Sequence, residues 1–153
     1  MSVVARLQQL GIQLPPVAKP VAAYVPAIRQ GHWVFTSGQI PFVEGKLKYA
    51  GVVGADVSEE EAYDAARVCC LNALAAVQSV AGNLDKIENI VRVIGFVASA
   101  PGFTNQAKVM NGASELLAEI FGDAGKHARS AIGTSVLPLN APVEVEMIVR
   151  LKA

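Results

Sequence analysis

Two kinds of charged residue stand within strand-like apolar stretches near the end of the chain. Arg129 lies in the run ARSAI at residues 128–132, and Glu144 and Glu146 alternate with apolar residues in the run VEVEM at residues 143–147. A guanidinium keeps its charge and can hold a carboxylate through two parallel hydrogen bonds. A nearby glutamate can accept or donate a proton during a reaction. This combination indicates acid–base chemistry on a small carboxylate.

The same residues also have a structural interpretation. Alternation along a strand would place Glu144 and Glu146 on a solvated face, and Arg129 would be an edge-strand charge or a salt-bridge partner. Residue types alone leave both interpretations open.

Other catalytic and cofactor motifs are missing from the sequence. His32 and His127 lie far apart without a ligand-spaced partner, so each is interpreted as a surface or loop histidine. The segment GVVG at residues 51–54 lacks the remaining glycine and the strand-to-helix context of a dinucleotide-binding loop, and it predicts a turn. The adjacent Cys69 and Cys70 sit in a helical pattern, which predicts buried apolar residues without a disulfide. We expect no bound metal or coenzyme.

Charge and hydropathy exclude two classes of partner. The 153 residues carry 13 Lys and Arg against 13 Asp and Glu, so no basic stripe is available for nucleic-acid phosphates. The longest apolar stretches are interrupted by polar residues such as Arg67, Asn72 and Arg92, which leaves no clean membrane-spanning segment. Arg6 and Gln8 interrupt the apolar run near the start, where a secretory signal would need its core. We expect a cytoplasmic protein.

The apolar content indicates an oligomer. Hydrophobic residues make up 52% of the chain and charged residues only 17%. A single domain covering residues 1–153 has too little interior for this surplus, because small domains expose much surface for their volume. The sequence therefore predicts a homo-oligomer with an apolar interface.

Periodicity predicts an α+β domain. Ser58 and Glu61 form a capping box that starts a helix ending near Ala81, and a second long helix is expected at residues 104–121. The remaining predicted elements are a short helix at residues 3–10 and strands at residues 21–28, 32–38, 87–98, 128–136 and 143–152. The order β-β-α-β-α-β-β predicts one mixed sheet with both long helices on one face. The bare face is the expected subunit interface.

The spacing of the last two strands constrains any site that uses both charges. If these strands form a hairpin centred near Leu139, then Arg129 and Glu144 lie on the same face, six residues apart along the ladder. At ~3.3 Å per residue the separation is roughly 20 Å. A site that contains both side chains must then be built from two subunits.

Four segments together resemble a known family. They are TSGQIP at residues 36–41, ARS at 128–130, LP at 137–138 and VEVE at 143–146. In this order, over nearly the whole chain, they resemble the reactive-intermediate deaminase family, also called the Rid or YjgF family. The resemblance implies a chorismate-mutase-like fold in a homotrimer with clefts between neighbouring subunits. It also implies hydrolysis of reactive enamines and imines to 2-oxo acids and ammonia without metal or coenzyme.

The resemblance also implies roles for individual residues. Arg129 matches the family arginine that grips the substrate carboxylate, and Glu144 matches the glutamate that orients the attacking water and manages its proton. The positions expected to line the cleft and bind substrate are Tyr24, Ser37, Gly38, Asn111 and Ser130.

The sequence departs from the family pattern at several places. Ala131 replaces the family cysteine two residues after the arginine, and His127 stands where a small residue or proline is commoner. The segment at residues 98–108 is longer than usual, and residues 1–20 form an N-terminal extension. These features indicate a divergent subgroup. Two alternatives remain open, a non-catalytic binding protein for 2-oxo acids or similar small carboxylates and an endoribonuclease, although neutral net charge argues against the second.

Overall fold

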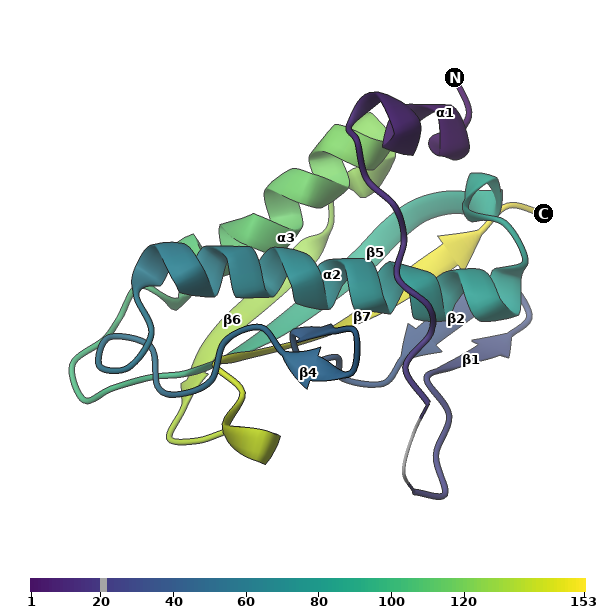
Figure 1. Cartoon of the computed structure of the whole chain (residues 1–153). Coiled ribbons are helices and arrows are strands. Elements are labelled where there is room, and N and C mark those ends of the chain that lie inside the picture. Colours follow the sequence, from purple (N-terminus) through teal and green to yellow (C-terminus); the bar gives the residue numbers. More distant parts are fainter. Residues whose placement is uncertain (20–21) are drawn as a thin grey trace.

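A computed structural model describes residues 1–19 and 22–153 of the chain, which form a layer of helices against a mixed sheet (Figure 1). The α-helices are α1 (Val3–Gln9), α2 (Glu59–Ala81) and α3 (Gln106–Phe121). The strands are β1 (Ala27–Gln30), β2 (Trp33–Thr36), β3 (Phe42–Val43), β4 (Lys46–Leu47), β5 (Ile87–Ala98), β6 (Ala128–Thr134) and β7 (Val143–Leu151). Three short 3-10 turns complete the set, η1 (Leu84–Lys86), η2 (Gly122–Gly125) and η3 (Pro138–Asn140).

Most predicted elements are confirmed. The predicted strand at residues 87–98 has the bounds of β5, and the predicted helices match α1, α2 and α3 to within two residues at each end. The predicted extended piece at residues 21–28 begins at Val21, which lies outside the described residues, and its described part is extended strand only from Ala27. The first sheet pair, β1 with β2, is antiparallel as expected for consecutive strands.

Helix α2 begins and ends where its sequence signals predict. The Ser58 hydroxyl accepts from the Glu61 backbone N–H, and the Glu61 carboxylate accepts from the Ser58 backbone N–H, which completes the capping box. Helix α3 packs closely alongside α2, and Gly112 permits this approach. A Cβ atom at Gly112 would lie 2.0 Å from the Tyr63 carbonyl oxygen. Both helices bury their apolar stripes against the sheet.

The strand order corrects the predicted hairpin. The large sheet runs β1-β2-β7-β5-β6, so β5 lies between β6 and β7. Strand β6 is parallel to β5, joined through α3, and β7 is antiparallel to both β2 and β5. The physical reason is the crossover: β5, α3 and β6 form a βαβ unit, which places two parallel strands side by side. The predicted hairpin between the last two strands is therefore wrong.

The two faces of the sheet differ in cover. Residues of β5 and β7 that point toward α2 and α3, such as Val93, Val97 and Val145, are fully buried. The opposite face carries no helix in the described part of the chain, which confirms the predicted bare face (Figure 1). Its exposed apolar side chains are Ile28, Trp33, Phe35 and Ile132, with 41 to 48% of their surface accessible. Ile28, Trp33 and Phe35 form a patch on the neighbouring strands β1 and β2, and Ile132 lies on the opposite edge strand, β6. Such a patch is typical of an interaction surface.

The N-terminal helix is attached to the helical layer. Leu7 of α1 is buried in the core, and the Val3 backbone N–H donates to the Asp85 carboxylate at 2.6 Å. Arg6 donates from Nε to the Glu119 carbonyl oxygen of α3 at 2.7 Å. Among the described residues, no helix is both long enough and apolar enough to cross a membrane.

Candidate functional site

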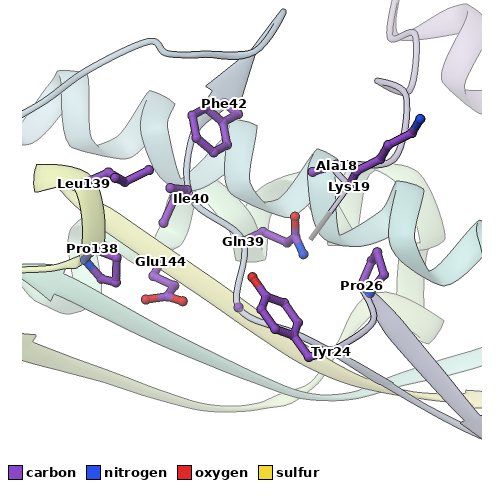
Figure 2. Close-up of a pocket in the computed structure, with 11 residues that line it drawn as sticks. Ala18, Lys19, Tyr24, Pro26, Gln39, Ile40, Phe42, Pro138, Leu139 and Glu144 are labelled. Atoms are coloured by element: carbon purple, nitrogen blue, oxygen red, sulfur yellow. The ribbon is translucent and has the colours of Figure 1, made fainter. Parts of the chain in front are cut away.

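A cavity of about 420 Å³ lies beside the start of β7, next to the segment that follows β2. Its walls are mostly apolar, formed by Pro26, Ile40, Phe42, Pro138 and Leu139. Four polar or charged side chains line it as well, those of Lys19, Tyr24, Gln39 and Glu144. In Figure 2 the Tyr24 hydroxyl and the Glu144 carboxylate both point into this space. An apolar cavity with few polar groups is the usual form of a small-molecule site.

Gly38 makes room for the Glu144 carboxylate. A Cβ atom on Gly38 would lie 2.1 Å from Glu144 Oε1, far inside van der Waals contact. The following residue, Gln39, forms a backbone bridge to Val145, with hydrogen bonds of 2.8 and 2.9 Å. The chain after β2 is thereby held directly against β7. Any side chain at position 38 would displace Glu144 from its present position.

Ser37 holds the segment that carries Tyr24. Its hydroxyl donates to the Val25 carbonyl oxygen at 2.5 Å, and its backbone N–H donates to the Pro26 carbonyl oxygen at 2.8 Å. Ser37 itself does not line the cavity. The structure therefore brings Tyr24, Gly38 and Glu144 together, with Ser37 as their support.

The environment of Glu144 favours the protonated carboxyl. Burial raises the pKa of Glu144 above its ordinary value, and repulsion from Glu146 raises it further. Within residues 1–19 and 22–153, no lysine, arginine or histidine forms an ion pair with this carboxylate. A carboxyl group with a raised pKa and no cationic partner is suited to proton transfer.

Arg129 lies in a second, separate cluster. It extends from β6 toward the helical layer, and its Nη1 donates to Asn111 Oδ1 at 2.9 Å and to Ser114 Oγ at 3.1 Å. Asn111 and Ser114 are three residues apart on α3, so they face the same side of the helix. Asn111, expected to line the cleft and bind substrate, is a hydrogen-bond partner of Arg129 in the structure. A hollow of about 280 Å³ adjoins the guanidinium and is also lined by Ser114 and His127.

The register places the two clusters on opposite faces of the sheet. Arg129 pairs with Val93 of β5, whose side chain is buried under the helices, and Glu144 pairs with Phe96 on the other face. The expectation of a shared face is wrong because it rested on the incorrect hairpin. The Cα atoms of Arg129 and Glu144 are offset by three residues along β5 and by two strand spacings across the sheet, which places them roughly 14 Å apart. Within one subunit the two side chains cannot contact the same small molecule.

Ser130, His127 and His32 have different surroundings in the structure. Ser130, expected to bind substrate, accepts a hydrogen bond from Arg92 Nη2 at 2.9 Å on the helix-free face, away from the Arg129 guanidinium. His127, interpreted as a surface or loop histidine, lies in the loop before β6, where it is half-buried and contacts Ser114 at 2.9 Å. His32, given the same interpretation, is exposed in the turn between β1 and β2. Ser114 was missed, although its spacing of three residues from Asn111 on a helix was a usable signal.

The cysteines take no part in either cluster. Cys69 and Cys70 are free and fully buried in α2, as predicted. Burial raises the pKa of the Cys70 thiol to about 12 and that of Cys69 well above its ordinary value. In the described ranges, no group of three or more His, Cys, Asp or Glu residues has the geometry to hold a metal ion.

Comparison with known proteins identifies the family. Residues 4–151 match the family described as "YjgF/chorismate mutase-like, putative endoribonuclease". The chain belongs to this family. Protein TCP17 of Trypanosoma cruzi is 41% identical over 150 residues, which cover 97% of this chain and 94% of that protein. Membership of the YjgF family supports a role in processing small molecules.

Two solved structures share the whole fold. A protein of Shewanella oneidensis MR-1, described as a "putative endoribonuclease", is 38% identical, covers 99% of this chain and 100% of its own, and superposes with a TM-score of 0.95. The protein Atu1372 of Agrobacterium tumefaciens is 42% identical, covers 98% of this chain and 92% of its own, and superposes with a TM-score of 0.91. The YjgF fold of this chain therefore includes the N-terminal helix and the segment before α3.

Proposed function

We propose that this protein hydrolyses reactive enamine and imine intermediates to 2-oxo acids and ammonia, in clefts built between neighbouring subunits. The observation that carries the proposal is the state of Arg129. Its guanidinium is held by two neutral oxygens, those of Asn111 and Ser114, and among the described residues no carboxylate pairs with it. Its positive charge is therefore left for an anionic ligand, and a fixed guanidinium can bind a carboxylate through two parallel hydrogen bonds.

Glu144 would supply the proton transfers. A protonated imine carbon is already electrophilic, so the reaction needs a positioned water more than a strong nucleophile. Water adds to the C=N carbon, and one of its protons passes to the Glu144 carboxylate and from there to the amine nitrogen. As ammonia leaves, the remaining hydroxyl proton passes to Glu144 and on to solvent, and the C=O bond forms. General acid–base help of this kind contributes about 10²- to 10⁴-fold to a rate. The raised pKa of Glu144 suits both steps.

A second subunit would complete the site. Arg129 and Glu144 cannot meet within one chain, and the helix-free face carries an exposed apolar patch that another copy would cover. A closed homotrimer would give three equivalent clefts, each with Glu144 from one subunit and Arg129 from its neighbour. The trimer, the absence of a metal or coenzyme, and a cytoplasmic location remain predictions.

The test is imine hydrolysis by purified protein. A coupled amino-acid oxidase generates 2-iminopropanoate, and its disappearance is followed with wild-type protein, Arg129→Ala and Arg29→Ala. Arg29 is a matched control because it is exposed on β1 and donates only to the Gly31 carbonyl oxygen. We expect kcat/KM to fall about 100-fold or more in Arg129→Ala, since a charged hydrogen-bond pair is lost, and to stay unchanged in Arg29→Ala. Full activity in Arg129→Ala would reject the assignment.

Two other functions would give different results. A non-catalytic binding protein would bind pyruvate by calorimetry, lose that binding in Arg129→Ala, and hydrolyse no imine. Endoribonuclease activity is suggested by the words that describe the family and the Shewanella relative. RNA cleavage that survives purification and disappears in Arg129→Ala would support it, although 13 basic against 13 acidic residues give little attraction for phosphates.

A further inference from the structure

His127 and Ser114 form a hydrogen-bonded chain that ends at the Arg129 guanidinium. Arg129 Nη1 lies 3.1 Å from Ser114 Oγ, and Ser114 Oγ lies 2.9 Å from His127 Nε2. At the other end, His127 Nδ1 lies 2.7 Å from the Gly125 carbonyl oxygen. Four groups are thus linked from strand β6 through helix α3 to the turn η2.

For a neutral His127 imidazole, the chemistry of the two ends fixes the direction of every hydrogen bond. A carbonyl oxygen can only accept, so His127 Nδ1 must carry a proton and donate it to Gly125. In a neutral imidazole Nε2 is then an acceptor, and the partner it accepts from is the Ser114 hydroxyl. Ser114 Oγ keeps its lone pairs for the Arg129 N–H group. The order of donation is therefore Arg129 to Ser114, Ser114 to His127, and His127 to Gly125.

We propose that His127 is a positioning residue for Arg129. By taking the Ser114 proton, the imidazole holds the serine oxygen with its lone pairs toward the guanidinium. Hydrogen bonds in such a chain strengthen one another in a partly buried site. Asn111 supplies the second acceptor, so Nη1 is fixed from two sides. This inference rests on the proposed function only in assuming that Arg129 binds a carboxylate.

The other charged groups nearby do not compete for His127. Lys126 precedes it, but the lysine ammonium is exposed and forms a 2.8 Å ion pair with Asp123. The remaining members of the hollow beside Arg129 are the neutral residues Ala118 and Gly125. Among the described residues, no carboxylate forms an ion pair with either His127 or Arg129. The orientation of the guanidinium thus depends on neutral partners, which leave its charge available.

The first test needs no ligand. In an 15N-labelled wild-type protein, long-range nitrogen–proton correlations report which ring nitrogen of a neutral histidine carries the proton. We expect the Nδ1-protonated form for His127, with the exposed His32 as the internal reference. We also expect a restrained Arg129 guanidinium signal that becomes mobile in His127→Phe. An Nε2 proton on His127, or an unchanged guanidinium signal in the variant, would overturn the proposal.

The second test uses kinetics. Arg129 holds the substrate carboxylate both before and during the reaction, so loosening it should raise KM more than it lowers kcat. For Ser114→Ala and His127→Phe we expect KM to rise about 10-fold with kcat within about 3-fold. His127→Gln, whose terminal carbonyl can accept from Ser114, should recover most of the loss. Ser79→Ala and His32→Phe are matched controls and should leave both constants unchanged.

A double variant distinguishes one hydrogen-bonded chain, in which His127 acts through Ser114, from two independent contacts. If His127 acts through Ser114, then Ser114→Ala with His127→Phe should lose no more than the worse single variant. Additive losses, or no recovery in His127→Gln, would contradict the proposal. If wild-type protein neither binds pyruvate nor hydrolyses imines, the proposed function fails, and the nitrogen spectra still decide the hydrogen-bonded chain by themselves.

Discussion

The Glu144 cavity and the Arg129 cluster have opposite effects on the charged group that each contains: the first destabilises the charged form and the second stabilises it. Glu144 stands half-buried among apolar walls, and its pKa is raised because burial and Glu146 oppose ionisation. Arg129 is satisfied by neutral oxygens that stabilise its charge without cancelling it. One region thus offers a proton acceptor and the other an anion site. An ion pair between the two would remove both properties, and their places on opposite faces of the sheet prevent such a pair within one chain.

The largest expected effect comes from removing the charge in the Glu144 cavity. Glu144→Gln should lower kcat about 10²- to 10⁴-fold because the proton acceptor is lost. Pyruvate affinity, measured by calorimetry, should stay within about threefold, since the Arg129 cluster is untouched. Glu60→Gln on the exposed first turn of α2 is the control. Equal losses of rate and affinity would point to a structural role for Glu144. The Glu144 cavity and the Arg129 cluster would then not have separate effects on rate and on affinity.

The next prediction concerns the position of the Glu144 carboxylate and not its presence. In Gly38→Ala the new Cβ would collide with Glu144 Oε1, and the flexible end of that side chain would move. We expect kcat to fall about 10- to 100-fold, as for a catalytic group displaced by about an ångström. Affinity for pyruvate, a measure of the Arg129 cluster, should not change. Wild-type kcat in Gly38→Ala would show that the present place of the carboxylate is not required.

A smaller effect is expected on the free energy of unfolding, which can be measured independently of activity. A carboxyl with a raised pKa in the folded state favours folding while it is protonated, and this contribution is lost as pH rises through that pKa. At neutral pH the ionised Glu144 therefore costs stability, and Glu144→Gln should resist denaturant better than wild type. The advantage should shrink in acid, where both proteins carry a neutral group. Equal or lower stability of the variant at neutral pH would contradict the burial assigned to this carboxylate.

The smallest effect concerns Glu146, which acts on Glu144 only through its charge. Glu146→Gln removes the weaker of the two causes that raise the Glu144 pKa. The acid limb of the pH profile of kcat should move to lower pH, while KM stays constant. Size-exclusion chromatography of the variant controls for changes in assembly. An acid limb that stays in place would mean that Glu144 is not the group that titrates in the reaction.

Local signals in the sequence predict the elements well and their pairing less well. The capping box at Ser58 and the apolar run of β5 define their elements, because hydrogen bonds and apolar periodicity are local. The hairpin prediction for β6 and β7 failed because consecutive strands were assumed to pair. Positive φ angles at Leu139 and Asn140 shape the turn that leads β7 away to the far side of β5. The βαβ rule applied to β5, α3 and β6 would have given the correct order.

The residues of the candidate site were also only partly predictable from the sequence. The charges of Arg129 and Glu144 in apolar strands mark them from residue types alone. Nothing in the spacing of Tyr24 and Gly38 indicates that they share a cavity with Glu144, because the contacts between distant segments depend on the register of the folded sheet. The link from His127 to Arg129 was overlooked because it passes through Ser114, a residue type that is common on helix surfaces. Family resemblance, and not spacing, supplied the cavity members.

Mixing two inactive variants tests the shared cleft most directly. Arg129→Ala and Glu144→Ala are unfolded together in equal amounts, refolded, and assayed for 2-iminopropanoate hydrolysis. If each cleft takes Glu144 from one subunit and Arg129 from its neighbour, random trimers should recover about a quarter of wild-type activity, since one cleft in four regains both residues. No recovery in mixed trimers, with each variant alone also inactive, would contradict a site made from two copies of the chain.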